Sequence, residues 1–264
     1  MPKPIARTQD RHRLYEASVQ NPDEEVRFIR RVYKQRYGRT PVFLREDFCG
    51  TAAVCARWVK SFPENRAVGV DLDEETLEWG RRNNIEPLGR AAEQVRLILG
   101  DVRSRRAFRP EVVAAMNFSY FVFKDRAALL DYYRRVRRSL RPEGMFVFDI
   151  YGGPESQIPQ EEETDYDDFT YVWDQDHYDP VTGAYRCYIH FRFPDGSRIR
   201  KAFAYDWRLW TLTEVQDLLR EAGFSETRVY WEGTDEDGDG NGVFRPVKKG
   251  DDAISWVAYV TAFC

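Results

Sequence analysis

The stretch from Phe43 to Val54, FLREDFCGTAAV, decides the fold of this chain. Its beginning is apolar and predicts a strand, the CGT at positions 49–51 predicts a tight turn, and a helical pattern starts at Thr51. A second apolar run, Ala67–Val70, predicts another strand, and it delivers Asp71 at its C-terminal end. A strand, turn and helix followed by a strand and an acid is typical of an open α/β sheet.

In such a sheet, the first turn and the carboxyl end of the neighbouring strand are where nucleoside cofactors bind. Gly50 lets the backbone approach a ligand closely, and Asp71 can accept hydrogen bonds from ribose hydroxyls. A NAD-dependent dehydrogenase is disfavoured, because its GxGxxG turn would need two further glycines where this chain reads TAAVC. The alternative for this segment is an ordinary strand-turn-helix without a ligand.

Composition limits the class of protein. The chain has 264 residues, of which 42% are apolar and 15% aromatic, enough to fill the core of one large domain with an insertion or of two small domains. No apolar run approaches the ~18 residues that cross a bilayer, and the N-terminus, MPKPIARTQDRHR, lacks an apolar segment. We therefore expect a cytoplasmic protein that is neither membrane-spanning nor secreted.

The metal-ligating residue types are sparse. The four cysteines (Cys49, Cys55, Cys187 and Cys264) form no CxxC pair, and only three histidines are present, so we expect free thiols and no zinc site. The acidic loop at 235–242 contains D-x-D-x-D-G, the first half of a calcium loop. The bidentate acid of an EF-hand would fall on Pro246, so we favour a mobile or substrate-rimming loop without a metal.

Charge is unevenly distributed. Residues 1–150 carry 29 Lys and Arg against 21 Asp and Glu, whereas residues 151–264 carry 11 against 23. A basic half can contact nucleic acid, but most of its arginines lie in helix-like runs such as 134–138, which are typical of a solvated face. The acids at 161–168 would repel phosphates from the second half of the chain.

Strand and helix patterns alternate over the first 150 residues. Helices are expected at 10–37, with Pro22 opening a second helix, and at 51–61, 74–84 and 126–140, and strands at 42–45, 67–70, 95–99, 112–116 and 145–150. This alternation predicts a parallel sheet that is covered by helices on both faces.

The pattern changes after residue 168. From Phe169 to Trp207 the apolar period is two, with turn signals at 179–183 and 194–197, which predicts a three-stranded antiparallel meander. A helix at 213–222, capped by Thr211 or Thr213, and strands at 227–231 and 254–262 follow. We divide the chain into an N-terminal helical cap (1–40), a cofactor-binding α/β core (41–152), an antiparallel β insertion acting as a substrate lid (153–209) and a C-terminal completion of the core sheet (210–264).

Five αβ units, a helix ending in EAGF and two terminal strands resemble the class I S-adenosylmethionine-dependent methyltransferases. The insertion is placed as in the small-molecule group that contains sugar N-methyltransferases and glycine N-methyltransferase. The resemblance covers roughly residues 40–150 and 208–264. It implies a doubly wound, mostly parallel seven-stranded Rossmann-like sheet with a small antiparallel insertion, and S-adenosyl-L-methionine as cofactor, with S-adenosyl-L-homocysteine as product.

The first family motif is an acid, two residues and a glycine-rich turn. Glu46 takes the position of the acid, and the resemblance implies that it meets the ammonium group of the methionine moiety, directly or through water. Cys49, Gly50 and Thr51 form the turn, with the backbone of Gly50 against the cofactor. Phe48 and Ala52 replace two glycines of the family. Alanine is tolerated if its φ is negative, whereas the bulk of Phe48 puts the turn geometry in question.

The remaining cofactor residues follow from the same resemblance. Asp71, with Leu72 beside it, would bind the ribose, and Asp101 would bind the adenine amino group, with Val102 lending its backbone N–H to the ring. Tyr15 would fold over the cofactor as an aromatic lid; its alternative is helix packing. For Asp101 the alternative is a helix cap or a turn residue.

The residues that the sequence suggests for catalysis would hold the reacting groups in position and would not transfer protons. A sulfonium carries its own leaving group, so methyl transfer is an in-line displacement that needs orientation and exclusion of water. Asn117, which the resemblance also places at the cofactor, and Tyr120 follow the fourth strand and would lie under the transferable methyl group. His177 lies on the insertion, and a sheet-surface residue is the favoured alternative to a catalytic role there.

We therefore expect a methyltransferase that acts on a small molecule, with an amine as one candidate acceptor, and that is a monomer or homodimer with no membrane partner. Nucleic acid is a disfavoured partner. The first alternative is an RNA or protein methyltransferase that docks its substrate on the basic N-terminal half. A non-catalytic S-adenosylmethionine-binding protein is the second.

Overall fold

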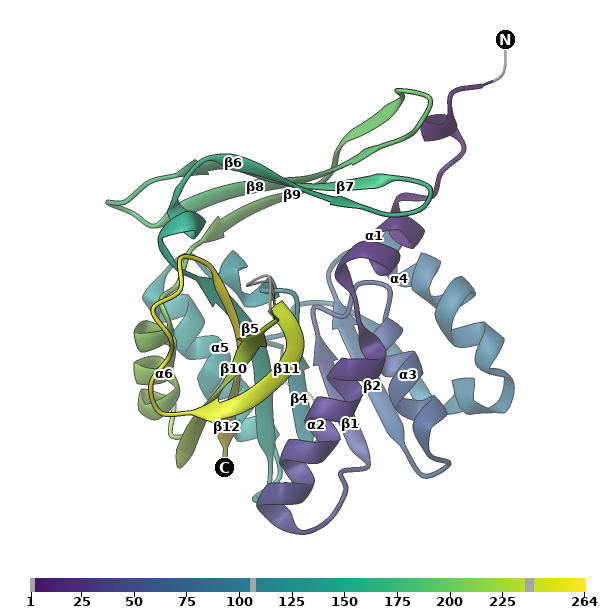
Figure 1. Cartoon of the computed structure of the whole chain (residues 1–264). Coiled ribbons are helices and arrows are strands. Elements are labelled where there is room, and N and C mark those ends of the chain that lie inside the picture. Colours follow the sequence, from purple (N-terminus) through teal and green to yellow (C-terminus); the bar gives the residue numbers. More distant parts are fainter. Residues whose placement is uncertain (1–2, 105–107, 236–239) are drawn as a thin grey trace.

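The structure is a computed structural model that describes residues 3–104, 108–235 and 240–264. Its strands form two sheets, one of eight strands and one of four. Figure 1 shows the four-stranded sheet lying across one end of the large sheet, with the first helices of the chain beside the large sheet. Among the described residues, no helix is long and apolar enough to cross a membrane.

The large sheet has the strand order β11-β10-β12-β5-β4-β1-β2-β3. Its members are β1 (Phe43–Asp47), β2 (Arg66–Asp71), β3 (Val95–Leu99), β4 (Val112–Ala115), β5 (Met145–Gly152), β10 (Glu226–Thr234), β11 (Gly240–Val247) and β12 (Trp256–Phe263). Strands β1 to β5 pair in parallel, and β12 and β10 add antiparallel strands. The chain order reverses between β1 and β4, and ligands of open α/β sheets bind outside the carboxyl ends of the strands at such a point.

The α/β class and the seven expected strands are confirmed, and one further strand, β11, pairs outside β10. Its sequence, GNGVFRPV, contains two glycines and a proline, which are turn residues by composition, so it was not expected as a strand. The acidic loop at 235–242 leads into β11, and residues 236–239 of that loop lie outside the described residues.

Helices cover both faces of the large sheet. The helices α2 (Pro22–Tyr37) and α3 (Ala53–Ser61) pack with one apolar cluster, and α5 (Arg126–Ser139) and α6 (Leu212–Glu221) pack with the other. Pro22 opens α2 and Thr211 caps α6 in a capping box with Glu214, as the sequence predicted. The other helical segments are α1 (Arg11–Val19), α4 (Glu74–Gly80), η1 (Ile5–Arg7), η2 (Arg81–Ile85), η3 (Glu86–Gln94), η4 (Ser119–Val122) and η5 (Pro154–Gln157).

The second sheet is antiparallel and has four strands, β6 (Gln160–Asp165), β7 (Thr170–Tyr178), β8 (Ala184–Arg192) and β9 (Arg198–Arg208), rather than the expected three. The additional strand β6 is exposed and acidic, so it has no apolar alternation that would reveal it in the sequence. The expected alternation is confirmed in β8, where Tyr185, Cys187, Ile189 and Phe191 are buried.

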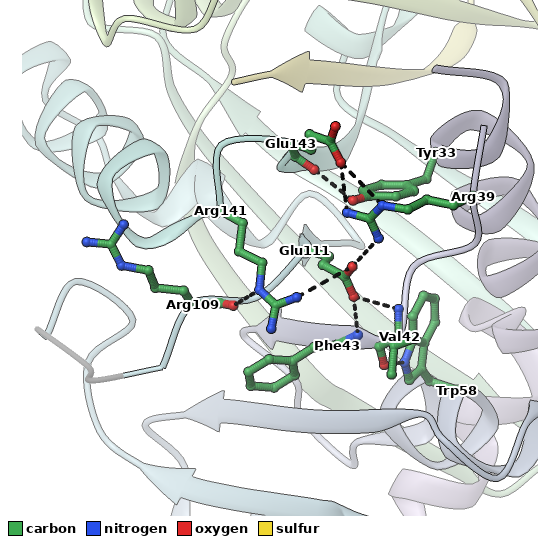
Figure 2. Close-up of polar contacts among 9 residues, drawn as sticks. All are labelled: Tyr33, Arg39, Val42, Phe43, Trp58, Arg109, Glu111, Arg141 and Glu143. Carbon is green, nitrogen blue, oxygen red and sulfur yellow. Dashed lines mark hydrogen bonds and ion pairs between the residues drawn. The ribbon is translucent and has the colours of Figure 1, made fainter. Parts of the chain in front are cut away.

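A buried acid, Glu111, joins the start of β1 to the segment that follows α2 (Figure 2). The carboxylate of Glu111 accepts hydrogen bonds from the N–H groups of Val42 and Phe43, at 2.7 and 2.9 Å, and pairs with Arg39 and Arg141. Burial alone would raise the pKa of Glu111, but these hydrogen bonds outweigh burial and hold that pKa below its usual range. This cluster fixes the start of β1 at the end of the sheet opposite to the candidate site.

Candidate functional site

The turn after β1 has the positive φ angles that glycine favours, although two of the glycines expected there are replaced by Phe48 and Ala52. The φ angles of Phe48, Gly50 and Ala52 are 57°, 51° and 58°. A negative φ at Ala52 would have tolerated alanine, but the structure has a left-handed residue there, which costs non-glycine residues roughly 1–2 kcal/mol. The ring of Phe48 packs against Phe123 and Tyr132, so part of its strain is offset by apolar contact.

Replacing Ala52 with glycine is expected to stabilise the protein by roughly 0.5–1 kcal/mol, because relief of the left-handed strain exceeds the added entropy of the unfolded chain. Urea unfolding followed by circular dichroism measures this difference. Ala56→Gly, inside α3, is the matched control and should cost about 1 kcal/mol. Equal losses in both variants would show that Ala52 is unstrained.

Hydrogen bonds tie this turn to the neighbouring strand. The carboxylate of Asp71 accepts from Gly50 N at 2.8 Å and from Asp73 N at 2.9 Å. Gly80 of α4 approaches from the side, where a Cβ atom would lie 2.3 Å from the carbonyl oxygen of Thr51. The Thr51 hydroxyl donates to Glu16 of α1 at 2.5 Å. The turn is thus held by β2, α4 and α1 together.

A cavity of about 450 Å³, here named the β2–β3 cavity, opens at the carboxyl ends of β2 and β3. Four of the expected cofactor residues, Asp71, Leu72, Asp101 and Val102, line it together with Phe48. Carboxylates that accept hydrogen bonds beside apolar side chains are what a ribose and a purine ring require. These residues fit the adenosyl part of the cofactor.

Arg103 completes this cavity and was not expected from the sequence. Its guanidinium pairs with Asp101 at 2.6 Å and lies over the ring of Phe123, 5.2 Å from the centroid. The hydrogen bond from Arg103 lowers the pKa of Asp101, although burial opposes the shift. Asp101 therefore remains an ionised acceptor at neutral pH.

Glu46 lies apart from the other two acids. Its side chain is buried, and its carboxylate accepts a hydrogen bond from Cys55 N at 3.0 Å, in the first turn of α3. Burial raises the pKa of Glu46 to about 7. The three acids named from the sequence thus do not line one cavity: Asp71 and Asp101 share the β2–β3 cavity, and Glu46 lies under the turn with Cys49, which is also buried.

A second cavity, of about 230 Å³ and here named the insertion cavity, lies between the four-stranded sheet and the large sheet. Tyr15 and Asn117, both expected at the site, line it. The other lining residues are mostly aromatic or polar: Val19, Phe118, Tyr151, Glu155, Ser156, Glu162, Tyr171, Trp173, Gln175, Ile189, Tyr205, Trp207, Ser255 and Val257. The acids Glu155 and Glu162 were not expected to be site residues, since nothing in the sequence links η5 and β6 to the loop after β4.

The loop that carries Asn117 is strained and held by one acid. Asn117 and Phe118 have φ angles of 58° and 55°, and their N–H groups both donate to Asp149 at 2.8 Å. Asp149 is buried in the second half of β5, and burial raises its pKa to about 7 in spite of these hydrogen bonds. Two successive left-handed residues present their side chains at the insertion cavity because Asp149 holds their backbone.

Two expected catalytic residues are not brought to either cavity. Tyr120 is fully buried in η4, and its ring packs against Phe148 and Phe121 in the core. His177 is exposed: a β-bulge after Gln175 changes the alternation of β7 and places His177 opposite Arg186 on the outer face. Core packing and a local bulge thus remove both side chains from the positions that the sequence suggested.

Among the described residues, one group of side chains has a spacing suited to a metal: Glu161, Asp174 and His190 on the four-stranded sheet. His190 uses Nε2 for Asp174, at 3.0 Å, and accepts from Lys201 N at Nδ1, at 2.7 Å. Glu161 pairs with Arg192. Because both ring nitrogens are engaged in the sheet itself, we assign no ion to this group.

Comparisons with known proteins agree with this geometry. Residues 47–148 match the family described as "Methyltransferase domain". A Bacillus subtilis (strain 168) protein named "Putative methyltransferase YqeM" is 22% identical over 196 residues, which are 71% of this chain and 75% of that protein.

Two solved structures share the fold. A S-adenosylmethionine-dependent methyltransferase from Clostridium acetobutylicum ATCC 824 has a TM-score of 0.69 at 17% identity, over 94% of this chain and 96% of its own. CalS10 from Micromonospora echinaspora, an amino pentose methyltransferase solved with S-adenosylmethionine bound, has a TM-score of 0.64 at 14% identity, over 98% of both chains.

The matched segment contains the turn, Asp71 and Asp101; the strand order places the turn at the switch point of the sheet, with Asp71 at the end of β2 and Asp101 just after β3. Residues 47–148 thus match the methyltransferase-domain family, and the chain has the fold of the solved S-adenosylmethionine-dependent methyltransferases.

Proposed function

We propose that the protein transfers a methyl group from S-adenosylmethionine to a small organic amine bound in the insertion cavity. The observation that carries the proposal is this cavity, which combines aromatic rings with two carboxylates and meets the Asn117–Phe118 loop at the switch point. Its volume of about 230 Å³ suits a small metabolite. In this interpretation residues 153–209 act as the substrate lid and residues 1–40 as the cap.

The lining of the insertion cavity supports a basic acceptor. Trp173 and Tyr205 present neighbouring rings, 5.8 Å apart, and aromatic faces attract cations. Glu162, on β6, lies at the rim, and Glu155 lies nearby on η5; burial, followed by the charge of Glu155, raises the pKa of Glu162. Two acids that share one cavity favour an amine that arrives protonated, and that amine must lose one proton, to Glu162 or to water, before its lone pair can accept the methyl group and S-adenosylhomocysteine can leave. The amino pentose acceptor of CalS10 gives this proposal further support.

The chain's residues would act by positioning. The cofactor supplies an activated methyl group with its own leaving group, so the protein has mainly to orient the acceptor and to exclude water. Asp149 fixes the loop that places Asn117 beside the acceptor, and the four-stranded sheet excludes water from the cavity. We place the methyl transfer at the boundary between the two cavities, with Asn117 and Tyr15 nearest to the reacting atoms.

The charges on the N-terminal half favour a small acceptor over RNA. Arg126 and Arg134 pair with Glu221, and Arg135 pairs with Asp131, so much of the arginine surface of α5 is already neutralised. Phosphate binding needs cations that can release counterions.

The four cysteines are free, which supports the expected cytoplasmic location.

A methyl-transfer screen with labelled S-adenosylmethionine and a panel of small amines and alcohols tests the proposal. We expect amines to be methylated, and Glu162→Gln to raise KM for the amine about fivefold or more while cofactor affinity is unchanged. Glu163→Gln is the matched control, because Glu163 pairs with Arg192 away from the cavity. Methylation of alcohols alone, or equal effects of the two variants, would contradict an amine acceptor at this site.

A further inference from the structure

One buried acid of α2 has no role in the site described so far. Glu25 is 4% exposed, lies in the first turns of α2, and its Oε2 atom has no hydrogen-bond partner. An unpaired carboxylate removed from water costs several kcal/mol, so it is rarely kept without a counterpart. No Lys or Arg of the described residues forms an ion pair with it.

Strand alternation places two other acids under the same face of α2. Leu44, Met145 and Val147 belong to the apolar cluster that α2 covers, and residues two positions further along these strands point to the same side. Those residues are Glu46, the last but one residue of β1, and Asp149, in the second half of β5. Both are buried.

The packing of α2 locates Glu25 above these ends. Phe28, one turn after Glu25, packs against Tyr259 with ring centroids 4.5 Å apart. Tyr259 is the cross-strand partner of Asp149 in the β12–β5 pairing. Figure 1 shows α2 running across the strands in this part of the large sheet. Glu25, Glu46 and Asp149 are therefore neighbours, and this group of three buried side chains is here named the acidic chamber.

Charge repulsion within the acidic chamber is consistent with this geometry. Burial, followed by the charges of Asp149 and Glu46, raises the pKa of Glu25 to about 8. Burial likewise raises the pKa values of Glu46 and Asp149 to about 7. Tyr15 of α1 and Tyr259 of β12 face the same acids and stay neutral, because burial raises the pKa of each above its usual value. Within residues 3–104, 108–235 and 240–264, no Lys or Arg forms an ion pair with any of these three acids.

The position of the acidic chamber indicates which cation it receives. The ends of β1 and β4 lie between Asp71, in the β2–β3 cavity, and Asn117, in the insertion cavity. A cofactor with its adenosyl part in the first cavity and its methyl group directed at the second brings its amino-acid end to these strand ends. That end carries an ammonium group.

We propose that Glu25 binds the α-ammonium group of the cofactor, with Glu46 and Asp149 completing the acidic chamber. Charge-assisted hydrogen bonds to a buried carboxylate are strong, and the ammonium group would give Oε2 of Glu25 the hydrogen-bond partner that it lacks. The inference concerns the cofactor only and does not depend on the identity of the acceptor. It assigns a binding role to the N-terminal helix α2, which neither the motif after β1 nor the methyltransferase-domain match at residues 47–148 includes.

Isothermal titration of Glu25→Gln with two ligands tests the assignment. S-adenosylhomocysteine carries the ammonium group, and 5′-methylthioadenosine lacks the whole amino-acid end. We expect the variant to bind S-adenosylhomocysteine about tenfold or more weakly and 5′-methylthioadenosine as the wild type does. Glu24→Gln, an exposed neighbour paired with Arg27, is the matched control and should change neither affinity. Equal weakening for both ligands, or no weakening, would overturn the proposal.

The wild-type protein gives an independent readout. With a pKa of about 8, Glu25 is largely protonated at pH 7, and an ammonium group favours its charged form, so binding should release protons. Titration of S-adenosylhomocysteine in buffers of different ionisation enthalpy measures this release, which should be absent for 5′-methylthioadenosine. Proton release that is the same for both ligands would also reject the assignment.

Because the pKa of Glu25 in the folded protein exceeds its unfolded value, stability without ligand should fall as pH rises from about 4.5 to about 8, and Glu25→Gln should reduce that fall.

Discussion

Replacement of Asp71 with alanine is expected to weaken S-adenosylmethionine binding by more than about tenfold while the fold survives. The carboxylate has two tasks: it accepts hydrogen bonds from Gly50 N and Asp73 N, and it faces the β2–β3 cavity where the ribose would bind. The variant loses both the acceptor for the ribose hydroxyls and the clamp on the turn. Isothermal titration with S-adenosylmethionine and its demethylated product measures the loss.

Asp73→Ala is the matched control for Asp71→Ala. Asp73 caps α4 by accepting from Thr76 N at 2.8 Å and does not line the β2–β3 cavity. Its removal should lower stability by about 1 kcal/mol and leave cofactor affinity nearly unchanged. An Asp71→Ala protein that binds the cofactor as the wild type does would place the ribose contact elsewhere.

Replacement of Arg45 with methionine is expected to destabilise the protein by about 3–5 kcal/mol. Arg45 and Asp47 are 3% and 0% exposed and form an ion pair at 2.7 Å, and Tyr132 donates to the same carboxylate oxygen at 3.0 Å. Without the guanidinium, the charge of Asp47 remains buried directly below the cofactor turn. Chemical denaturation at pH 7 measures the difference in the free energy of unfolding.

Two further variants separate the buried charge from the loss of packing. Arg45→Met combined with Asp47→Leu should recover most of the stability, since replacing both partners by apolar residues is often neutral. Arg135→Met, which breaks an exposed pair with Asp131 on α5, should change stability by no more than about 0.5 kcal/mol. A loss from Arg45→Met no larger than that of Arg135→Met would contradict the argument.

Local signals predicted much of the fold. Pro22 and Thr211 mark the starts of α2 and α6 because a missing N–H and a side-chain cap act within one turn of helix. The alternation of Tyr185, Cys187, Ile189 and Phe191 predicted the buried face of β8. The strands β6 and β11 lacked such a signal, because each forms by pairing with a neighbour and not by burying its own apolar residues.

The candidate site was predictable in part. Asp71, Leu72, Asp101 and Val102 share one cavity, and Tyr15 and Asn117 share the other, while Cys49, Gly50 and Thr51 form the turn after β1 and Glu46 lies in β1 under that turn. The binding roles of all these residues stay predictions, which the variants above test. Tyr120 and His177 show the limit of the approach, because core packing and a bulge decide where a side chain points.

The sequence by itself determined the class of the fold and the strand-turn-helix that supports a nucleoside, because these depend on contacts between residues close in the chain. Only the tertiary structure decided that Asp149 holds the loop of Asn117, that Glu162 reaches the insertion cavity, and that Glu25 lies over the strand ends. Even the left-handed backbone of Phe48 and Ala52 is imposed from outside the turn. The physical reason is that the order of strands in a sheet joins segments more than a hundred residues apart, and no local pattern specifies which polar groups then meet.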